Sequence, residues 1–339
     1  MQNTEKKNHR LSLLAVAFFA ALIAVSACFF AAPQKAHADE INLNDPLFFG
    51  SNGTTTGLFT DINLKSPFTE KKEVSWDIVG NTLVIKDDLK IAPTTGTALV
   101  VMTDGMGIKI EEGKTFTLLG SGGTGVSGSP YAALSVQGSC TIAGPGSIAA
   151  SMTENIGVDR RAIDVFGGKT LTIDGVSGSI SSGNAHATAG EQTIGIAGHS
   201  GSQLVLKNEA NLVVSSGTAT AKSYGIWIDA SVPLAIDATS NLTIYGESNA
   251  LLASGEAPSL PTKGVFIGST STDGSNPGPV EWQEGEVYRM AGSTDPSGDA
   301  LWLKFGLVPT ISTASPLPNG LKGTAYSQGL ATEDDSAVT

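Results

Sequence analysis

Between residues 76 and about 270 the apolar residues come in short alternating pairs, the spacing of β-strands rather than of helices. Five segments each open with a small residue followed by an aliphatic one, and their starts lie 26, 29, 33 and 30 residues apart. A spacing this regular predicts a repeated structural unit. The five openings are Gly107-Ile108, Ala133-Leu134, Ala162-Ile163, Gly195-Ile196 and Gly225-Ile226.

Two further apolar pairs follow in these segments, so we expect three short strands in each repeat. The second pairs are Phe116 and Leu118, Cys140 and Ile142, Leu171 and Ile173, Leu204 and Leu206, and Leu234 and Ile236. The third pairs are Ile148 and Ala150, Ile180 and Ser182, Leu212 and Val214, and Leu242 and Ile244.

Alternation along a strand sends neighbouring side chains to opposite faces. It predicts one interior ladder of Phe116, Cys140, Leu171, Leu204 and Leu234, and outward positions for Asp164, Thr172, Val205, Trp227 and Thr243. A three-strand unit cannot bury its own apolar face, but units stacked about 4.8 Å apart can share one core. A sandwich of hairpins fits the strand lengths equally well. It does not explain why the same three-strand pattern recurs.

The segments KTLTIDG (169–175) and SNLTIYG (240–246) resemble the pectin-lyase-like parallel β-helix superfamily and, within it, bacterial carbohydrate-binding β-helix surface proteins. The resemblance covers about residues 76–270. It implies an all-β fold, a single-stranded right-handed parallel β-helix with three short strands per coil, and a polysaccharide or host or bacterial glycan as partner. Because this fold also serves lyases, hydrolases and passive stalks, it does not fix the activity.

The first 38 residues have the order of a secretory signal peptide. Lys6, Lys7 and Arg10 precede an apolar run, and Ala36-His37-Ala38 predicts cleavage after Ala38 and a secreted or cell-surface location. A lipoprotein with its lipid on Cys28 is one alternative, because residues 25–28 read Val-Ser-Ala-Cys. An uncleaved anchor helix is another, because about 20 apolar residues can span a membrane.

The chain carries 20 basic and 32 acidic residues, a net charge of −12. Cleavage after Ala38 would remove four basic residues and one acidic residue, which leaves 16 against 31 and a net charge of −15. Nucleic acid and anionic lipid are therefore disfavoured as partners. Cys140 would be the one remaining cysteine, so no internal disulfide is expected and stability must come from packing.

We expect five segments along the chain. Residues 1–38 are the signal peptide, 39–75 an irregular N-terminal cap, 76–290 the β-helix, 291–307 a C-terminal cap and linker, and 308–339 the start of an Ig-like β-sandwich. Trp282, Tyr288, Trp302 and Phe305 are candidates to close the far end. The last segment resembles an Ig-like family of bacterial surface proteins at Leu317, Gly323, Tyr326 and Leu330. A complete sandwich needs about 100 residues, so we expect this domain to be truncated and a cell-wall anchor to lie beyond it.

Enzymes of the resembling superfamily place several carboxylates, or carboxylates with a basic residue and calcium, on one outer face. Asp164 has no acidic neighbour in the repeat, 159–161 (Asp-Arg-Arg) fits a solvated loop, and His199 fits an isolated turn histidine. We therefore expect no enzyme and no cofactor. Calcium is an alternative that no acidic cluster supports.

Other acidic residues fit turns. Asp174 and Asp237 occupy equivalent positions two coils apart with Lys207 between them, which predicts a ladder that balances its own charge. The pairs Glu111-Glu112 and Asp87-Asp88 fit solvated turns.

Three aromatic rings leave their strands on the outer side and are the candidate carbohydrate-binding residues: Trp227, Tyr245 and Phe166. An exposed ring can stack on the apolar face of a sugar. Alternatively, a neighbouring loop such as 183–194 covers them.

These features favour a non-catalytic surface protein, a β-helical stalk or adhesin that binds carbohydrate. The alternatives are a polysaccharide lyase or glycoside hydrolase and a purely structural spacer. An enzyme would bring at least three acidic or basic residues within about 6 Å of one another on an exposed face.

Overall fold

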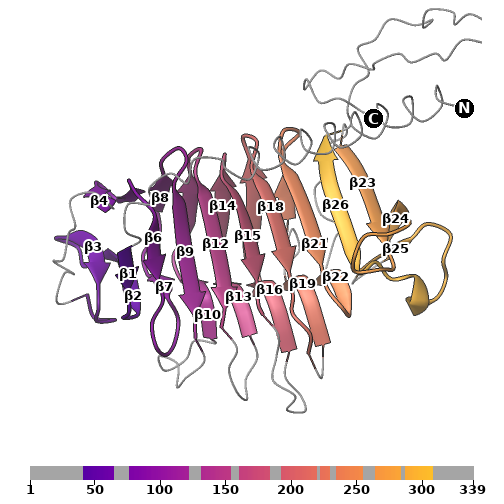
Figure 1. Ribbon diagram of the computed structural model, residues 1–339, viewed down its shortest axis with the longest axis horizontal. Helices are drawn as coiled ribbons and strands as arrows, with labels where there is room; N and C mark the ends of the chain where they lie inside the picture. Colours follow the sequence, from indigo (N-terminus) through magenta and orange to yellow (C-terminus); the bar gives the residue numbers. More distant parts are fainter. Residues whose placement is uncertain are drawn as a thin grey trace, which may run out of the picture. The chain divides into compact units, whose positions relative to one another are not determined.

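The computed structural model of the chain describes residues 41–64, 76–121, 131–153, 160–183, 192–219, 222–229, 234–254, 264–283 and 287–307. These residues form β-strands and one short 3-10 helix, η1 (Pro296–Gly298). The strands wind into coils stacked side by side (Figure 1). The predicted all-β parallel β-helix with three strands per coil is confirmed.

Three parallel sheets run along the stack, and the chain visits them in the order C, A, B. Sheet C contains β5 (Thr82–Ile85), β8 (Met106–Ile110), β11 (Cys140–Ala143), β14 (Thr170–Asp174), β17 (Gln203–Lys207) and β20 (Leu234–Ile236). Sheet A contains β6 (Leu89–Ile91), β9 (Thr115–Gly120), β12 (Ser147–Met152), β15 (Ser177–Ser181), β18 (Asn211–Ser215) and β21 (Asn241–Tyr245). Sheet B contains β7 (Leu99–Val101), β10 (Tyr131–Val136), β13 (Arg160–Val165), β16 (Gln192–Gly198), β19 (Lys222–Asp229) and β22 (Asn249–Ser254).

The inner ladder of sheet C differs at one position from the prediction. Its members are in register and buried: Met106, Cys140, Leu171, Leu204 and Leu234. Phe116 was wrongly placed in it, because Phe116 lies on β9 in sheet A and opposes Leu89 and Ile148. The error arose at Gly107-Ile108, which looks like a repeat opening but belongs to β8 of sheet C.

The third apolar pair of one coil is also shifted. Ile180 opposes Ala150 and Val214, and Gly178 opposes Ile148 and Leu212. The inward pair is therefore Gly178 and Ile180 rather than Ile180 and Ser182. A glycine at an inward position conceals the strand from a search for apolar residues.

The small residue that opens a repeat turns inward where the chain enters sheet B. Ala162 and Ile163, adjacent in sequence, both belong to the main core, as do Ala133 and Leu134. Two successive inward residues leave no room for a large first one. At Gly225 an added Cβ would lie 2.3 Å from Ile244 Cγ2. Packing at this corner thus explains the small-then-aliphatic signature.

Short strands cover both ends of the stack. At the N-terminal end β1 (Ile41–Leu43) and β2 (Leu47–Ser51) pair in parallel with β6 and β7, and hairpins with β2 and β5 add β3 (Thr56–Phe59) and β4 (Trp76–Val79). Residues 41–59 are therefore largely strand, not irregular as predicted.

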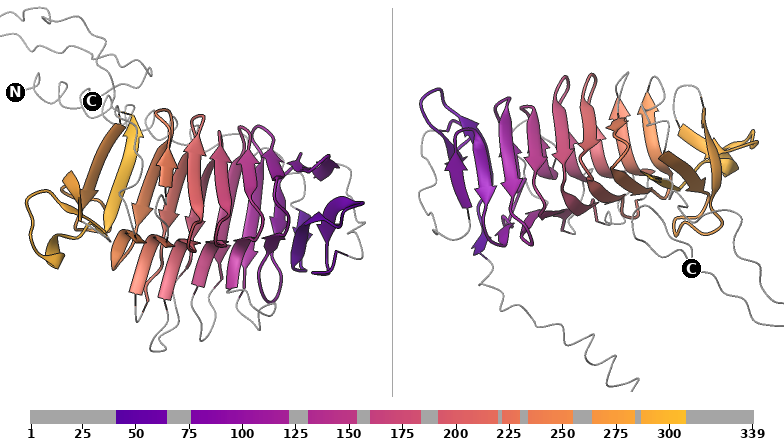
Figure 2. Two further views of the ribbon diagram at one scale, coloured as in Figure 1. Left: turned by 180° about the vertical axis from the view of Figure 1, so that it is seen from behind. Right: turned by 90° about the horizontal axis from the view of Figure 1, so that it is seen from above.

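At the C-terminal end, parallel stacking stops at β22, well before residue 290. Antiparallel strands follow, drawn orange to yellow in Figure 2: β23 (Gly264–Ser269), β24 (Gly278–Gln283), β25 (Val287–Met290) and β26 (Trp302–Leu307). Phe266, Tyr288 and Phe305 bring their rings within 4.3–6.4 Å of one another against the main core. Burial raises the pKa of Tyr288.

The predicted signal peptide (1–38) and the Ig-like segment (308–339) lie outside the described residues. Among the residues that are described, no helix is long and apolar enough to cross a membrane.

Candidate functional site

The outer side of sheet B carries a second layer of side chains. Ile194, Ala197 and Tyr224 form a buried cluster there, separate from the main core, with Trp227 and Leu252 packed against it. Asp164 points to the same side, since its neighbours Ile163 and Val165 belong to the core, yet none of it is exposed. A fully buried carboxylate needs partners.

Arg161 and His199 are those partners. Arg161 Nη1 lies 2.8 Å from Asp164 Oδ1, and His199 Nε2 lies 3.0 Å from the same oxygen. Arg161 and Asp164 share one side of the strand although they are three residues apart, because Ala162 and Ile163 both turn inward between them. The Arg161 side chain is 13% exposed and that of His199 36%. His199 is thus the member of this polar cluster that solvent reaches most easily.

The geometry assigns the hydrogen of the His199 ring. An arginine only donates, so Arg161 donates to Oδ1. A hydrogen on His199 Nε2 makes a second hydrogen bond to Oδ1, whereas a bare Nε2 would face it lone pair to lone pair. Arg161 Nη1 and His199 Nε2, 3.1 Å apart, are then two donors to one oxygen. In the neutral ring with its hydrogen on Nε2, Nδ1 is the nitrogen that can accept a hydrogen bond from a ligand.

The sequence interpretation of these residues was wrong on two points. His199 is not an isolated turn histidine, since it contacts Asp164 and Arg161. Arg161 is not in a solvated loop either, because it is the first outward residue of β13 and mostly buried. Asp159 lies outside the described residues. The repeat contained a usable signal: Ile163 and Ile196 are equivalent, so Phe166 and His199, each three residues further on, are neighbours.

Two aromatic rings flank His199. The Phe166 and His199 ring centroids are 5.9 Å apart, and those of His199 and Trp227 are 6.2 Å apart with the planes nearly perpendicular. The three residues come from β13, β16 and β19 or the turns that follow them, so the row crosses three neighbouring coils. Phe166 and Trp227 are half-buried. Each therefore keeps part of its ring surface open.

Tyr245, the third candidate ring, lies on another sheet. It ends β21 in sheet A and opposes Ser215 and Trp302. The structure therefore brings together Phe166 and Trp227 through His199 and places Tyr245 apart from them.

Polar atoms without a partner surround Asp164. Asp164 Oδ2, Arg161 Nε and Ser135 Oγ are buried and form no hydrogen bond within the described part of the chain. Ser135 opposes Asp164 in register on β10. Buried polar groups are nearly always hydrogen-bonded, so these three atoms require partners outside the described residues.

Several other aspartates link turns of neighbouring coils. Lys207 pairs with Asp174 at 3.2 Å, which confirms one step of the predicted charge-balanced ladder, and Asp237 accepts a hydrogen bond from the Asn208 N–H at 2.7 Å. Burial alone would raise the pKa of Asp237, but hydrogen bonds from the Asn208 N–H and from Ser240 and Thr239 hold it below the ordinary value. Nowhere in the described ranges do three His, Cys, Asp or Glu side chains gather as a metal site would require.

Comparison with protein-family models, curated proteins and solved structures finds no match to this chain. Its function must therefore be argued from the site itself.

Proposed function

We propose that this protein is an exported cell-surface β-helix that binds carbohydrate without cleaving it, and that the outer side of sheet B is its binding surface. The observation that carries the proposal is the row Phe166, His199 and Trp227, in which the central ring is held by Asp164 and Arg161. A sugar has an apolar face that covers an aromatic ring and a rim of hydroxyls that need donors and acceptors. The row supplies both within one patch.

The proposed export to the cell surface rests on residues 1–38, whose basic, apolar and Ala-x-Ala segments are those of a secretory signal peptide. The net negative charge agrees with a partner that is neither nucleic acid nor anionic lipid. The inward ladders and three-strand coils support a relationship with the pectin-lyase-like superfamily. An Ig-like module from residue 308 completes the proposed surface protein.

Affinity for a single glycan should be modest. Stacking contributes about 1 kcal/mol per ring beyond the buried area, so we expect roughly millimolar binding to short oligosaccharides. Polysaccharides that contact many copies of the protein on a cell would bind more tightly.

The test is affinity electrophoresis against plant, mucin and bacterial polysaccharides. A polysaccharide that retards the unmodified protein should retard Trp227→Ala and Phe166→Ala much less. Tyr245→Ala is the matched ring removal on sheet A and should change little. If Tyr245→Ala alone abolishes retardation, the surface is on sheet A. If no polysaccharide retards the protein, the proposal fails.

A second candidate, a polysaccharide lyase or hydrolase, is favoured by one observation. Arg161, Asp164 and His199 converge within hydrogen-bonding distance, and Asp164 fixes His199 with Nδ1 available as a base. Against it, Asp164 is the only carboxylate among the three and is fully buried. His199→Gln separates the candidates, since glutamine retains a donor for Asp164 but cannot act as a base. Release of reducing ends or unsaturated products by the unmodified protein, lost in His199→Gln, would establish the enzyme.

A further inference from the structure

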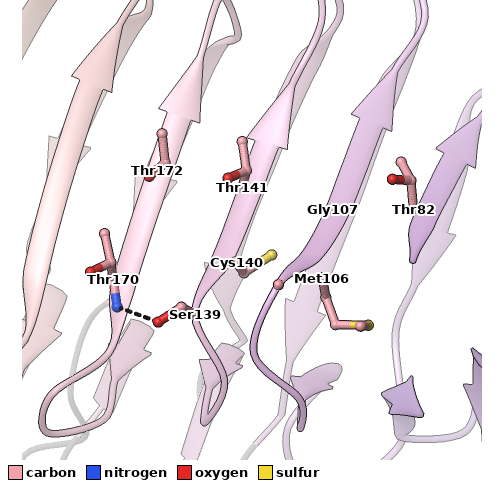
Figure 3. A pocket seen from close by; sticks show the side chains of 9 residues that line it. Thr82, Met106, Gly107, Ser139, Cys140, Thr141, Thr170 and Thr172 are labelled. Atoms are coloured by element: carbon pink, nitrogen blue, oxygen red, sulfur yellow. Dashed lines mark hydrogen bonds between the residues drawn. The ribbon is translucent and has the colours of Figure 1, made fainter. Parts of the chain in front are cut away.

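A hollow of about 230 Å³ opens on the outer side of sheet C, across β5, β8, β11 and β14 (Figure 3). It lies on a different face from the ring row. Its lining residues are Thr82, Gly105, Met106, Gly107, Ser139, Cys140, Thr141, Thr170 and Thr172.

A missing side chain creates the hollow. Thr82, Gly107, Thr141 and Thr172 stand in register as one outward row. Gly107 interrupts this row of threonines, and an added Cβ there would lie 2.9 Å from Thr82 Oγ1. The backbone of Gly107 is ordinary strand, so its conformation would accept any residue. The glycine therefore leaves open space beside Thr82 rather than serving a special backbone conformation.

The lining suits an uncharged ligand that carries several hydroxyls. Five hydroxyl groups surround the opening, and each can both donate and accept. Ser139 Oγ accepts a hydrogen bond from the Thr170 N–H at 3.2 Å, which leaves its own hydrogen to donate. No lining residue is charged, and the nearby Asp104 and Lys169 neutralise each other at 2.9 Å. A charged ligand would find no counter-charge in this lining. Met106 and Cys140 belong to the inner ladder of sheet C, so their buried side chains face the core.

The hollow and the ring row flank the same corner of the stack. Phe166 ends the sheet B side and Thr170 begins β14, with a tight turn between them that the Lys169 N–H closes onto the Phe166 carbonyl at 3.0 Å. Four residues span at most about 14 Å. A short oligosaccharide can cross that distance.

We infer that this hollow is a subsite for a neutral sugar residue, and that one neutral oligosaccharide runs from the ring row around the corner between sheets B and C into it. The inference rests on the proposed carbohydrate function. It adds a second contact surface and a ligand class, because the hydroxyl lining selects uncharged sugars.

Gly107→Thr tests it by continuing the row of threonines and filling the hollow. The probes are neutral hexasaccharides of glucose, mannose and galactose with the matching disaccharides, measured by calorimetry and by amide shifts of ¹⁵N-labelled protein. We expect Gly107→Thr to weaken hexasaccharide binding about tenfold and to leave disaccharide binding unchanged. Trp227→Ala should weaken both.

Thr141→Val, which retains shape and removes one hydroxyl, gives the same test if Gly107→Thr does not fold. Thr243→Val on the outer side of sheet A is the matched control and should bind normally. If Trp227→Ala loses binding while Gly107→Thr and Thr141→Val keep it, the subsite is refuted and the proposed function stands. If no neutral hexasaccharide shifts the amides of Gly107 and Thr141, the subsite is refuted. The polysaccharide panel then decides the proposed function separately.

Discussion

The inner and outer sides of sheet B are built by the same strands but follow different rules. The inner row is aliphatic and buried in every coil: Leu134, Ile163, Ile196, Ile226 and Leu251. The next residues along form the outer row, which changes its chemistry at each step: Ser135, Asp164, Ala197, Trp227 and Leu252. Stacking of the coils restricts the residue types on the inner side, because those side chains form the shared core. The proposed binding surface lies on the side that is free to vary.

The largest effect should come from a charge on the inner side. Leu204→Asp puts a carboxylate where 1% of the side chain is exposed, and we expect no folded protein. Val205→Asp, the outward neighbour on β17, should melt close to the unmodified protein. Circular dichroism during heating measures both. Equal tolerance of the two substitutions would contradict the assignment of sides.

Cys140 reports the same inner ladder without a substitution. Burial raises the pKa of its thiol to about 12, and 3% of the residue is exposed. Maleimide should therefore react only when the stack opens, at least about a thousandfold more slowly than in urea, given opening energies of about 5 kcal/mol. Rapid stoichiometric labelling of native protein would show that the ladder register is wrong.

One ion pair on the outer side of sheet B and one on the outer side of sheet C differ in burial, so we expect them to contribute differently to stability. Asp164→Ala leaves the mostly buried Arg161 without its partner and should cost roughly 3 kcal/mol in the free energy of unfolding. Asp174→Ala removes the partner of Lys207, which is 43% exposed, and should cost less than about 1 kcal/mol. Urea unfolding compares them. Similar costs would mean that the Asp164 cluster is no more enclosed than an ordinary surface pair.

The smallest expected effect is the loss of folding stability at low pH when Asp87 becomes protonated. A hydrogen bond from Lys114 is the main reason that the pKa of Asp87 lies below its ordinary value of 3.8. A lowered carboxyl pKa stabilises the fold above the unfolded value, and that stability disappears as pH falls through the folded value. Asp87→Asn should lose up to about 1 kcal/mol at neutral pH and match the unmodified protein in strong acid. A constant difference across pH would exclude this titration as the cause.

Local spacing was enough to predict the parallel β-helix. Inward ladders such as Leu171, Leu204 and Leu234 recur because each coil must bury its apolar residues against the next. The shifts at Phe116 and Gly178 show the limit of that reasoning. An alternating pattern tells which side a residue faces but not which of three similar sheets holds it.

The sequence by itself determined the repeat, the core residues, and Phe166 and Trp227 as outward rings, because alternation and stacking are properties of neighbours along the chain or one coil away. Only the tertiary structure decided that His199 meets Asp164 and Arg161, that Tyr245 lies on another face, and that Gly107 opens a hollow. Those contacts depend on the inward turn at Ala162-Ile163 and on the exact number of residues in each coil. The number of residues between equivalent positions varies from coil to coil, so the side chains that meet are decided only when the coils pack together.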